Sequence, residues 1–169
     1  MIALLALATA TVVDPAVTDF ERFCLSGRPA HAILAAAERA GWKSGGADAP
    51  KQFDPATQRY LPTSGGALVL RAEDTTSAGE TRQGCGIIPP QPDIGMAAAL
   101  EQDLGVAPAF HAGTAATFNV IKTDNGWRAG TDRSEWKKAH DEGRLYSIMT
   151  SGGSPSFIAT LHVLANGSH

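Results

Sequence analysis

Histidine, cysteine and paired carboxylates are the residue types in this 169-residue chain that could carry catalysis or hold a metal ion. The histidines share one property: none has a second histidine or a cysteine at the spacing of a zinc or metalloprotease motif. They are His31, His111, His140, His162 and His169. A metal site would need assembly from distant loops, so the sequence predicts no metal and no cofactor.

The two cysteines, Cys24 and Cys85, indicate one disulfide bond in an exported chain. That bond would close a loop of about 60 residues and contribute roughly 4 kcal/mol in the chain-entropy account. Two buried free thiols, or one reactive thiol acting with a histidine, are the alternatives. Neither cysteine belongs to a C-x-x-C motif, which disfavours zinc binding and redox chemistry.

Acidic residues could supply the carboxylate pair that a glycoside hydrolase needs. The candidates are Glu73 with Asp74, Glu101 with Asp103, and Glu135 with Asp141 and Glu142. Solvated surface charge is the commoner role of such residues. The chain has no G-x-S-x-G motif, and its two Thr-Ser-Gly-Gly segments lack the Gly-Lys-Ser/Thr of a phosphate loop. The sequence therefore names no catalytic residue.

A tryptophan beside a tight turn suggests where a ligand could bind. Trp127 follows an Asp-Asn-Gly turn and precedes Arg128, and it is the least obviously buried of the three tryptophans. Packing in the core is the commoner role of a tryptophan. With His111 and His140, these two residues make up our candidate ligand surface.

Apolar periodicity predicts the elements that would position these residues. Residues 17–24 carry apolar side chains at helical spacing, and an alanine-rich helix over 30–40 follows, ending at Gly41. Further helices are predicted from Asp93 to residue 104 and from Asp132 or Ser134 to residue 142. Strands are predicted over 67–73, 80–88, 117–122, 127–130, 145–150 and 157–165. Most of 43–60 and all of 108–116 are interpreted as loop.

These elements favour a single α+β domain, with two to three helices packed on an antiparallel sheet of about six short strands. A hydrophobic content of 43% is typical of a globular chain. The net charge of −3 argues against nucleic acid as a partner, and no apolar run is long enough for an integral membrane segment. Residues 1–10 are predicted to be a signal peptide, truncated because no basic residue precedes the apolar run, and 11–169 the domain.

Two segments resemble small exported bacterial proteins of unknown function. These segments are Thr-Asp-Phe-Glu-Arg-Phe-Cys with the later Glu-Arg-Ala-Gly-Trp-Lys, and Arg-Gln-Gly-Cys around Cys85. Proteins of that kind carry an early helix with a cysteine, an alanine-rich helix ending in Gly-Trp, and a second cysteine on a later strand. The resemblance implies a periplasmic or secreted single domain and no particular activity.

The first hypothesis is an exported, non-enzymatic protein that binds an envelope component, a partner protein or a small ligand. The alternative is a small envelope hydrolase that uses dispersed carboxylates or histidines. A deep pocket lined by two or more of four residues would favour the enzyme. They are His111, His140, Glu135 and Asp141. A shallow groove beside Trp127 would favour binding, and an exposed apolar patch would favour an inhibitor-like partner protein.

Overall fold

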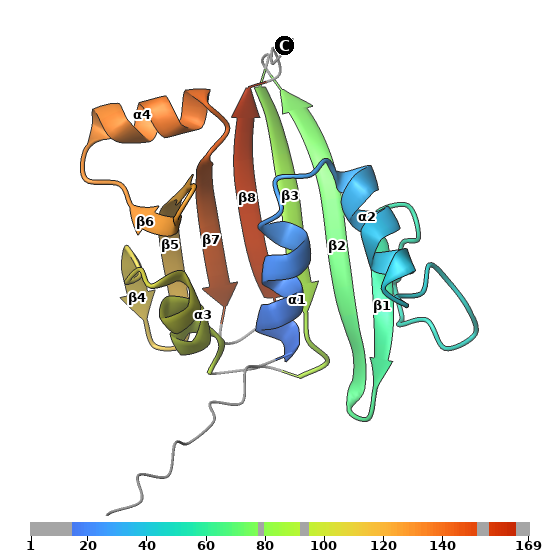
Figure 1. Cartoon of the computed structure of the whole chain (residues 1–169). Coiled ribbons are helices and arrows are strands. Elements are labelled where there is room, and N and C mark those ends of the chain that lie inside the picture. The colour runs from blue at the N-terminus through green and yellow to red at the C-terminus, as the bar shows by residue number, and fades with distance from the viewer. Residues whose placement is uncertain (1–14, 78–79, 92–94, 152–155, 165–169) are drawn as a thin grey trace, which may run out of the picture.

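The computed structural model describes residues 15–77, 80–91, 95–151 and 156–164. Within these ranges the chain forms four helices and eight strands. The sheet is antiparallel, in the order β1-β2-β3-β8-β7-β5-β4, and β6 also pairs with β5 (Figure 1). The predicted α+β class is confirmed: the four helices correspond to the four helical segments predicted, and the described chain has two more strands than the six expected.

The helices are α1 (Pro15–Cys24), α2 (Ala30–Arg39), α3 (Met96–Leu104) and α4 (Arg133–Asp141). The strands are β1 (Gln58–Thr63), β2 (Gly66–Ser77), β3 (Glu80–Ile88), β4 (Phe110–Ala112), β5 (Ala115–Thr123), β6 (Gly126–Ala129), β7 (Leu145–Ser151) and β8 (Ser156–Leu164). The Asp132 carboxylate caps α4 by accepting from two backbone N–H groups. The cap predicted at Asp93 and the signal peptide predicted at 1–10 lie outside the described residues.

Helices α1, α2 and α3 lie over one face of the sheet (Figure 1). The strand residues beneath them alternate with residues of the other face, as the pleat of a strand requires. Those buried under the helices are Leu68, Leu70, Ala72, Cys85, Ile87, Ala116, Phe118, Val120, Tyr146, Ile148 and Thr150. The helices contribute Val17, Phe20, Phe23, Ile33, Leu34, Ala37, Met96, Leu100 and Leu104 to the same core.

Strand β1 differs from the sequence analysis, which assigns most of 43–60 to a loop and predicts no strand before residue 67. Its sequence is polar and includes Pro62, which favours an edge position where one side of the strand needs no partner. Pairing with β2 on one side makes it a strand, and the backbone of Lys43 pairs with Tyr60 on the other. The Tyr60 hydroxyl donates to Asp48 at 2.7 Å, which fastens the loop that runs outside β1.

Helix α4 lies toward the opposite face of the sheet from α1. Trp127 of β6 lies opposite Lys122 of β5, and the Lys122 ammonium donates to the carbonyl of Leu25 at the end of α1. The next residue of β6, Arg128, instead forms an ion pair with Glu135 of α4. Successive residues of a strand point to opposite faces, so α1 and α4 lie on different sides. No helix in the described ranges is long and apolar enough to cross a membrane.

Candidate functional site

A cavity of about 330 Å³ opens between α1 and α2. Three of its lining residues are arginines and three are apolar. They are Arg22, Arg28, Arg39, Phe23, Ala36 and Ala40. Among the residues that the structure describes, no carboxylate, histidine, serine or cysteine side chain lines it. The cavity therefore combines a cationic rim with an apolar wall.

The two helices present these residues because each also has a face buried in the core. On α2, Ala36 and Ala40 are four residues apart and Arg39 lies between them, so all three lie on one side. The adjoining face of α2 buries Ile33 and Ala37. The small alanine side chains leave room for the cavity. The aliphatic part of the Arg39 side chain can lie along the cavity wall while its guanidinium group stays at the solvent-facing rim.

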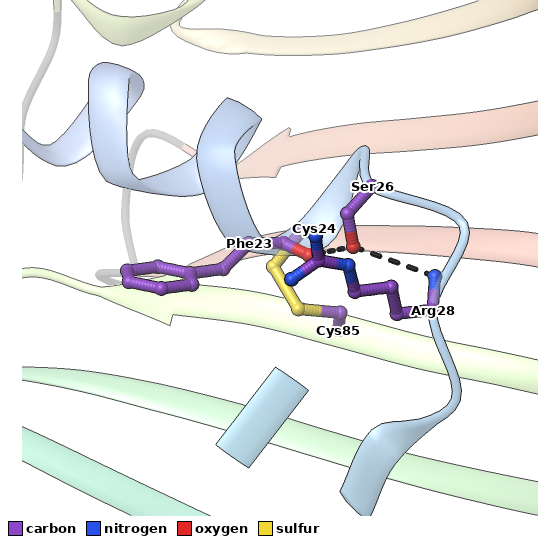
Figure 2. Close-up of a disulfide and its surroundings, with 5 residues drawn as sticks. All are labelled: Phe23, Cys24, Ser26, Arg28 and Cys85. Carbon is purple, nitrogen blue, oxygen red and sulfur yellow. Dashed lines mark hydrogen bonds between the residues drawn. A yellow bond between two sulfur atoms is a disulfide. The ribbon is translucent and has the colours of Figure 1, made fainter. Parts of the chain in front are cut away.

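The disulfide bond between Cys24 and Cys85 fixes the chain where α1 ends (Figure 2). It joins α1 to β3 with 5.2 Å between the Cα atoms, as predicted from the two-cysteine composition. In the segment that follows, the Ser26 hydroxyl donates to the Phe23 carbonyl at 2.7 Å. Figure 2 shows the Arg28 side chain directed back toward the end of α1, beside this bond.

Two further long-range contacts hold the α1–α2 connection. The Lys122 ammonium donates to the Leu25 carbonyl at 2.9 Å, a favourable place for a cation because the C-terminal end of a helix carries partial negative charge. The Asp74 carboxylate accepts from the backbone N–H of Ala30 at 3.0 Å. Asp74 thereby supplies the N-terminal cap that Pro29 cannot provide from its own side chain. The connection is anchored at both ends.

The arginines around the cavity are poorly neutralised. Within the described ranges neither Arg28 nor Arg39 forms an ion pair, and Arg22 lies over the Phe23 ring at 5.1 Å. Burial raises the pKa of Asp19, one helical turn before Arg22, while the Arg22 charge acts in the opposite direction. A chain with a net charge of −3 therefore presents a local cluster of positive charge.

The structure does not bring together the four residues of the candidate ligand surface predicted from sequence. The Trp127 ring packs edge-on against Tyr146, with centroids 5.1 Å apart, and lies under the Lys122 ammonium. Burial raises the pKa of Tyr146 to about 12. Arg128 points to the other face and binds Glu135 at 2.5 Å. Trp127 therefore packs on the face of the sheet that α1 covers, and Arg128 forms an ion pair with α4 on the other face.

The two histidines of that prediction also lie apart. His111 is exposed on the short edge strand β4, and His140 lies on α4 with its Nδ1 atom 3.3 Å from Asp141. Neither lines the cavity between α1 and α2. In the part of the chain that is described, no group of three His, Cys, Asp or Glu residues could hold a metal ion.

Three of the carboxylates considered for catalysis have other partners. The Arg128 guanidinium, with the amide and hydroxyl of Thr131, lowers the pKa of Glu135 to about 2. Asp141 pairs with Lys137, and Asp74 caps α2. Glu135 and Asp141 are therefore held in the ionised form at neutral pH.

Sequence reasoning missed the three arginines of the cavity. Arg22, Arg28 and Arg39 lie in three separate segments, and each is typical of a solvated surface residue when considered alone. One signal was available: Arg22 and Arg28 flank Cys24, so the predicted disulfide already fixed the chain between them. Nothing in the sequence indicated that Arg39 would complete the group.

Comparison with known proteins identifies no relative. No protein-family model, no curated protein and no solved structure matches this chain. The functional interpretation is therefore based on the residues of the cavity and their chemistry.

Proposed function

We propose that this chain is an exported, non-enzymatic protein that binds a small anionic ligand in the cavity between α1 and α2. One observation carries the proposal: three arginine side chains surround a cavity of about 330 Å³, and no carboxylate of the described part of the chain lines it. Guanidinium groups recognise carboxylates and phosphates through paired N–H donors. A bound anion would offset the positive charge of the arginine side chains that line the cavity.

The chemistry of the lining residues supports binding over catalysis. A guanidinium stays protonated at any physiological pH, and phenylalanine and alanine carry no group that transfers protons. None of these side chains can act as a nucleophile or as a general base near neutral pH. The rival hydrolase would have to act elsewhere, with residues such as Glu135 and Asp141 that already pair with cations.

A periplasmic or secreted location is part of the proposal. The Cys24–Cys85 bond supports it, because disulfides persist mainly in oxidising compartments. Fractionation of cells, followed by alkylation with and without a reductant, tests the location. We expect the protein in the exported fraction with both thiols protected. Recovery in the cytosol with both cysteines alkylated without reductant would contradict this part of the proposal.

Thermal-shift screening tests the binding function. The probes are small organic acids, together with the amides and amines of the same carbon skeletons. A ligand present at 100 times its Kd stabilises the native state by about 2.7 kcal/mol, so acids that bind should raise Tm. The rise should be lost in Arg39→Gln and kept in Arg133→Gln, which removes the same charge outside the cavity. Equal shifts from acids, amides and amines, or shifts unchanged in Arg39→Gln, would contradict the proposal.

A further inference from the structure

We infer that the anion bound in the cavity is the phosphoryl group of a phosphate monoester whose organic part is apolar. This inference rests on the proposed function and specifies its ligand. The cavity has two distinct parts, a cationic rim and an apolar wall, and each constrains a different portion of the ligand.

The number of charges favours a dianion. Three arginine side chains line one cavity, and the positive charges that they carry repel one another. A bound carboxylate would offset one positive charge, whereas a phosphate monoester carries close to two negative charges near neutral pH. The dianion therefore relieves more of the repulsion among Arg22, Arg28 and Arg39.

The placement of the arginines also favours a phosphoryl group. Arg22 projects from the last turn of α1, Arg28 from the connection and Arg39 from the end of α2. They therefore approach the cavity from three segments of the chain. A carboxylate offers two oxygens in one plane, but a phosphate monoester offers three non-ester oxygens in a tetrahedral arrangement. Guanidinium groups that approach from three different segments match the tetrahedral oxygens of a phosphate monoester better than the planar oxygens of a carboxylate.

The remaining wall limits the organic part of the ester. Phe23, Ala36 and Ala40 have no side-chain donor or acceptor for a hydroxyl group. A sugar or polyol would lose hydrogen bonds to water on entering and regain none from these side chains. An aryl or alkyl group would instead gain apolar contact with them. The short alanine side chains leave the space for it.

Titration calorimetry with four soluble probes tests the inference. The probes are phenyl phosphate, inorganic phosphate, glycerol phosphate and benzoate. We expect phenyl phosphate to bind roughly tenfold or more tightly than either benzoate or glycerol phosphate. Benzoate keeps the aromatic ring but makes fewer charge-assisted hydrogen bonds, whereas glycerol phosphate keeps the phosphoryl group but loses the apolar contact. Vesicles of phosphatidylcholine with and without phosphatidic acid show whether a lipid headgroup or a soluble ester is preferred. Binding to either source supports the phosphoryl assignment.

Two variants separate recognition from simple charge attraction. Arg28→Lys keeps the positive charge but loses the forked donor, and should weaken phenyl phosphate roughly tenfold. Arg133→Gln, outside the cavity, should change the affinity less than about twofold, since screening weakens distant charges. Benzoate binding as tightly as phenyl phosphate would overturn the phosphoryl assignment and leave the anion-binding proposal standing. Failure of every probe, vesicles included, would overturn both.

Discussion

Removal of the disulfide bond is the perturbation whose effect on stability follows most directly from the structure. The bond joins residues 61 positions apart, and both cysteines are about 95% buried in the core between α1 and β3. In the chain-entropy account, a loop of this length restricts the unfolded state by about 4 kcal/mol. The double variant Cys24→Ala/Cys85→Ala should therefore lose about that much free energy of unfolding.

Denaturant unfolding measures this loss. Because the linear unfolded chain exposes more surface than the cross-linked one, the dependence of the free energy on denaturant concentration should also become steeper. For a domain of this size, a loss of about 4 kcal/mol corresponds to a Tm lower by about 8–16 °C. A loss below about 1 kcal/mol, with an unchanged denaturant dependence, would refute the argument. It would mean that the disulfide bond restricts the unfolded chain much less than the chain-entropy account assumes.

Two more predictions concern α4 and the turn before it. A Cβ atom at Gly130 would lie 1.8 Å from Nε1 of Trp136, so Gly130→Ala should cost about 1–3 kcal/mol by denaturant unfolding. Gly65→Ala, where a Cβ meets nothing within 4 Å, should change stability by less than about 0.5 kcal/mol; equal costs would contradict the packing. The pKa of Glu135 is lowered to about 2 chiefly by Arg128, so this pair stabilises the fold above about pH 4.5 and loses its effect as the pH falls toward 2. Across that range Tm should fall more steeply for the wild type than for Glu135→Gln, and parallel curves would contradict the pairing.

Local patterns predicted the helices well because their signals lie within each segment. The spacing of Val17, Phe20 and Cys24 placed the buried face of α1, and all three are buried. Asp132 was one of two candidate caps for α4, and its carboxylate accepts from the N–H groups of Ser134 and Glu135. The cysteine pair was predicted from composition alone, since only two cysteines are present.

The strands were harder to delimit because pairing with a partner, rather than local propensity, decides where they end. The sequence predicts a strand over 67–73, yet β2 continues to Ser77 because it pairs with β3. Residues 110–112 form β4 only through their contact with β5. In these segments apolar and polar side chains do not alternate regularly, so the sequence carries no period of two from which the strand ends could be predicted.

The cavity was beyond the reach of sequence analysis for a related reason. It exists because α1 and α2 pack side by side on the sheet, which brings Arg39 near Arg22 and Arg28. The anchoring contacts of the connection are also non-local: Asp74 lies 44 residues from Ala30, and Lys122 lies 97 residues from Leu25. Each of these charged residues alone predicts only a solvated surface group.

Binding of a phosphoryl group by the arginines of the cavity between α1 and α2 would change the environment of each guanidinium group. NMR observation of arginine side-chain N–H groups during titration with phenyl phosphate tests it most directly, because each arginine reports separately. We expect saturable shifts of the Arg22, Arg28 and Arg39 signals, and no change in the signal of Arg133 on α4. Shifts confined to arginines outside the cavity, or none at these three when the ligand saturates the protein, would contradict it.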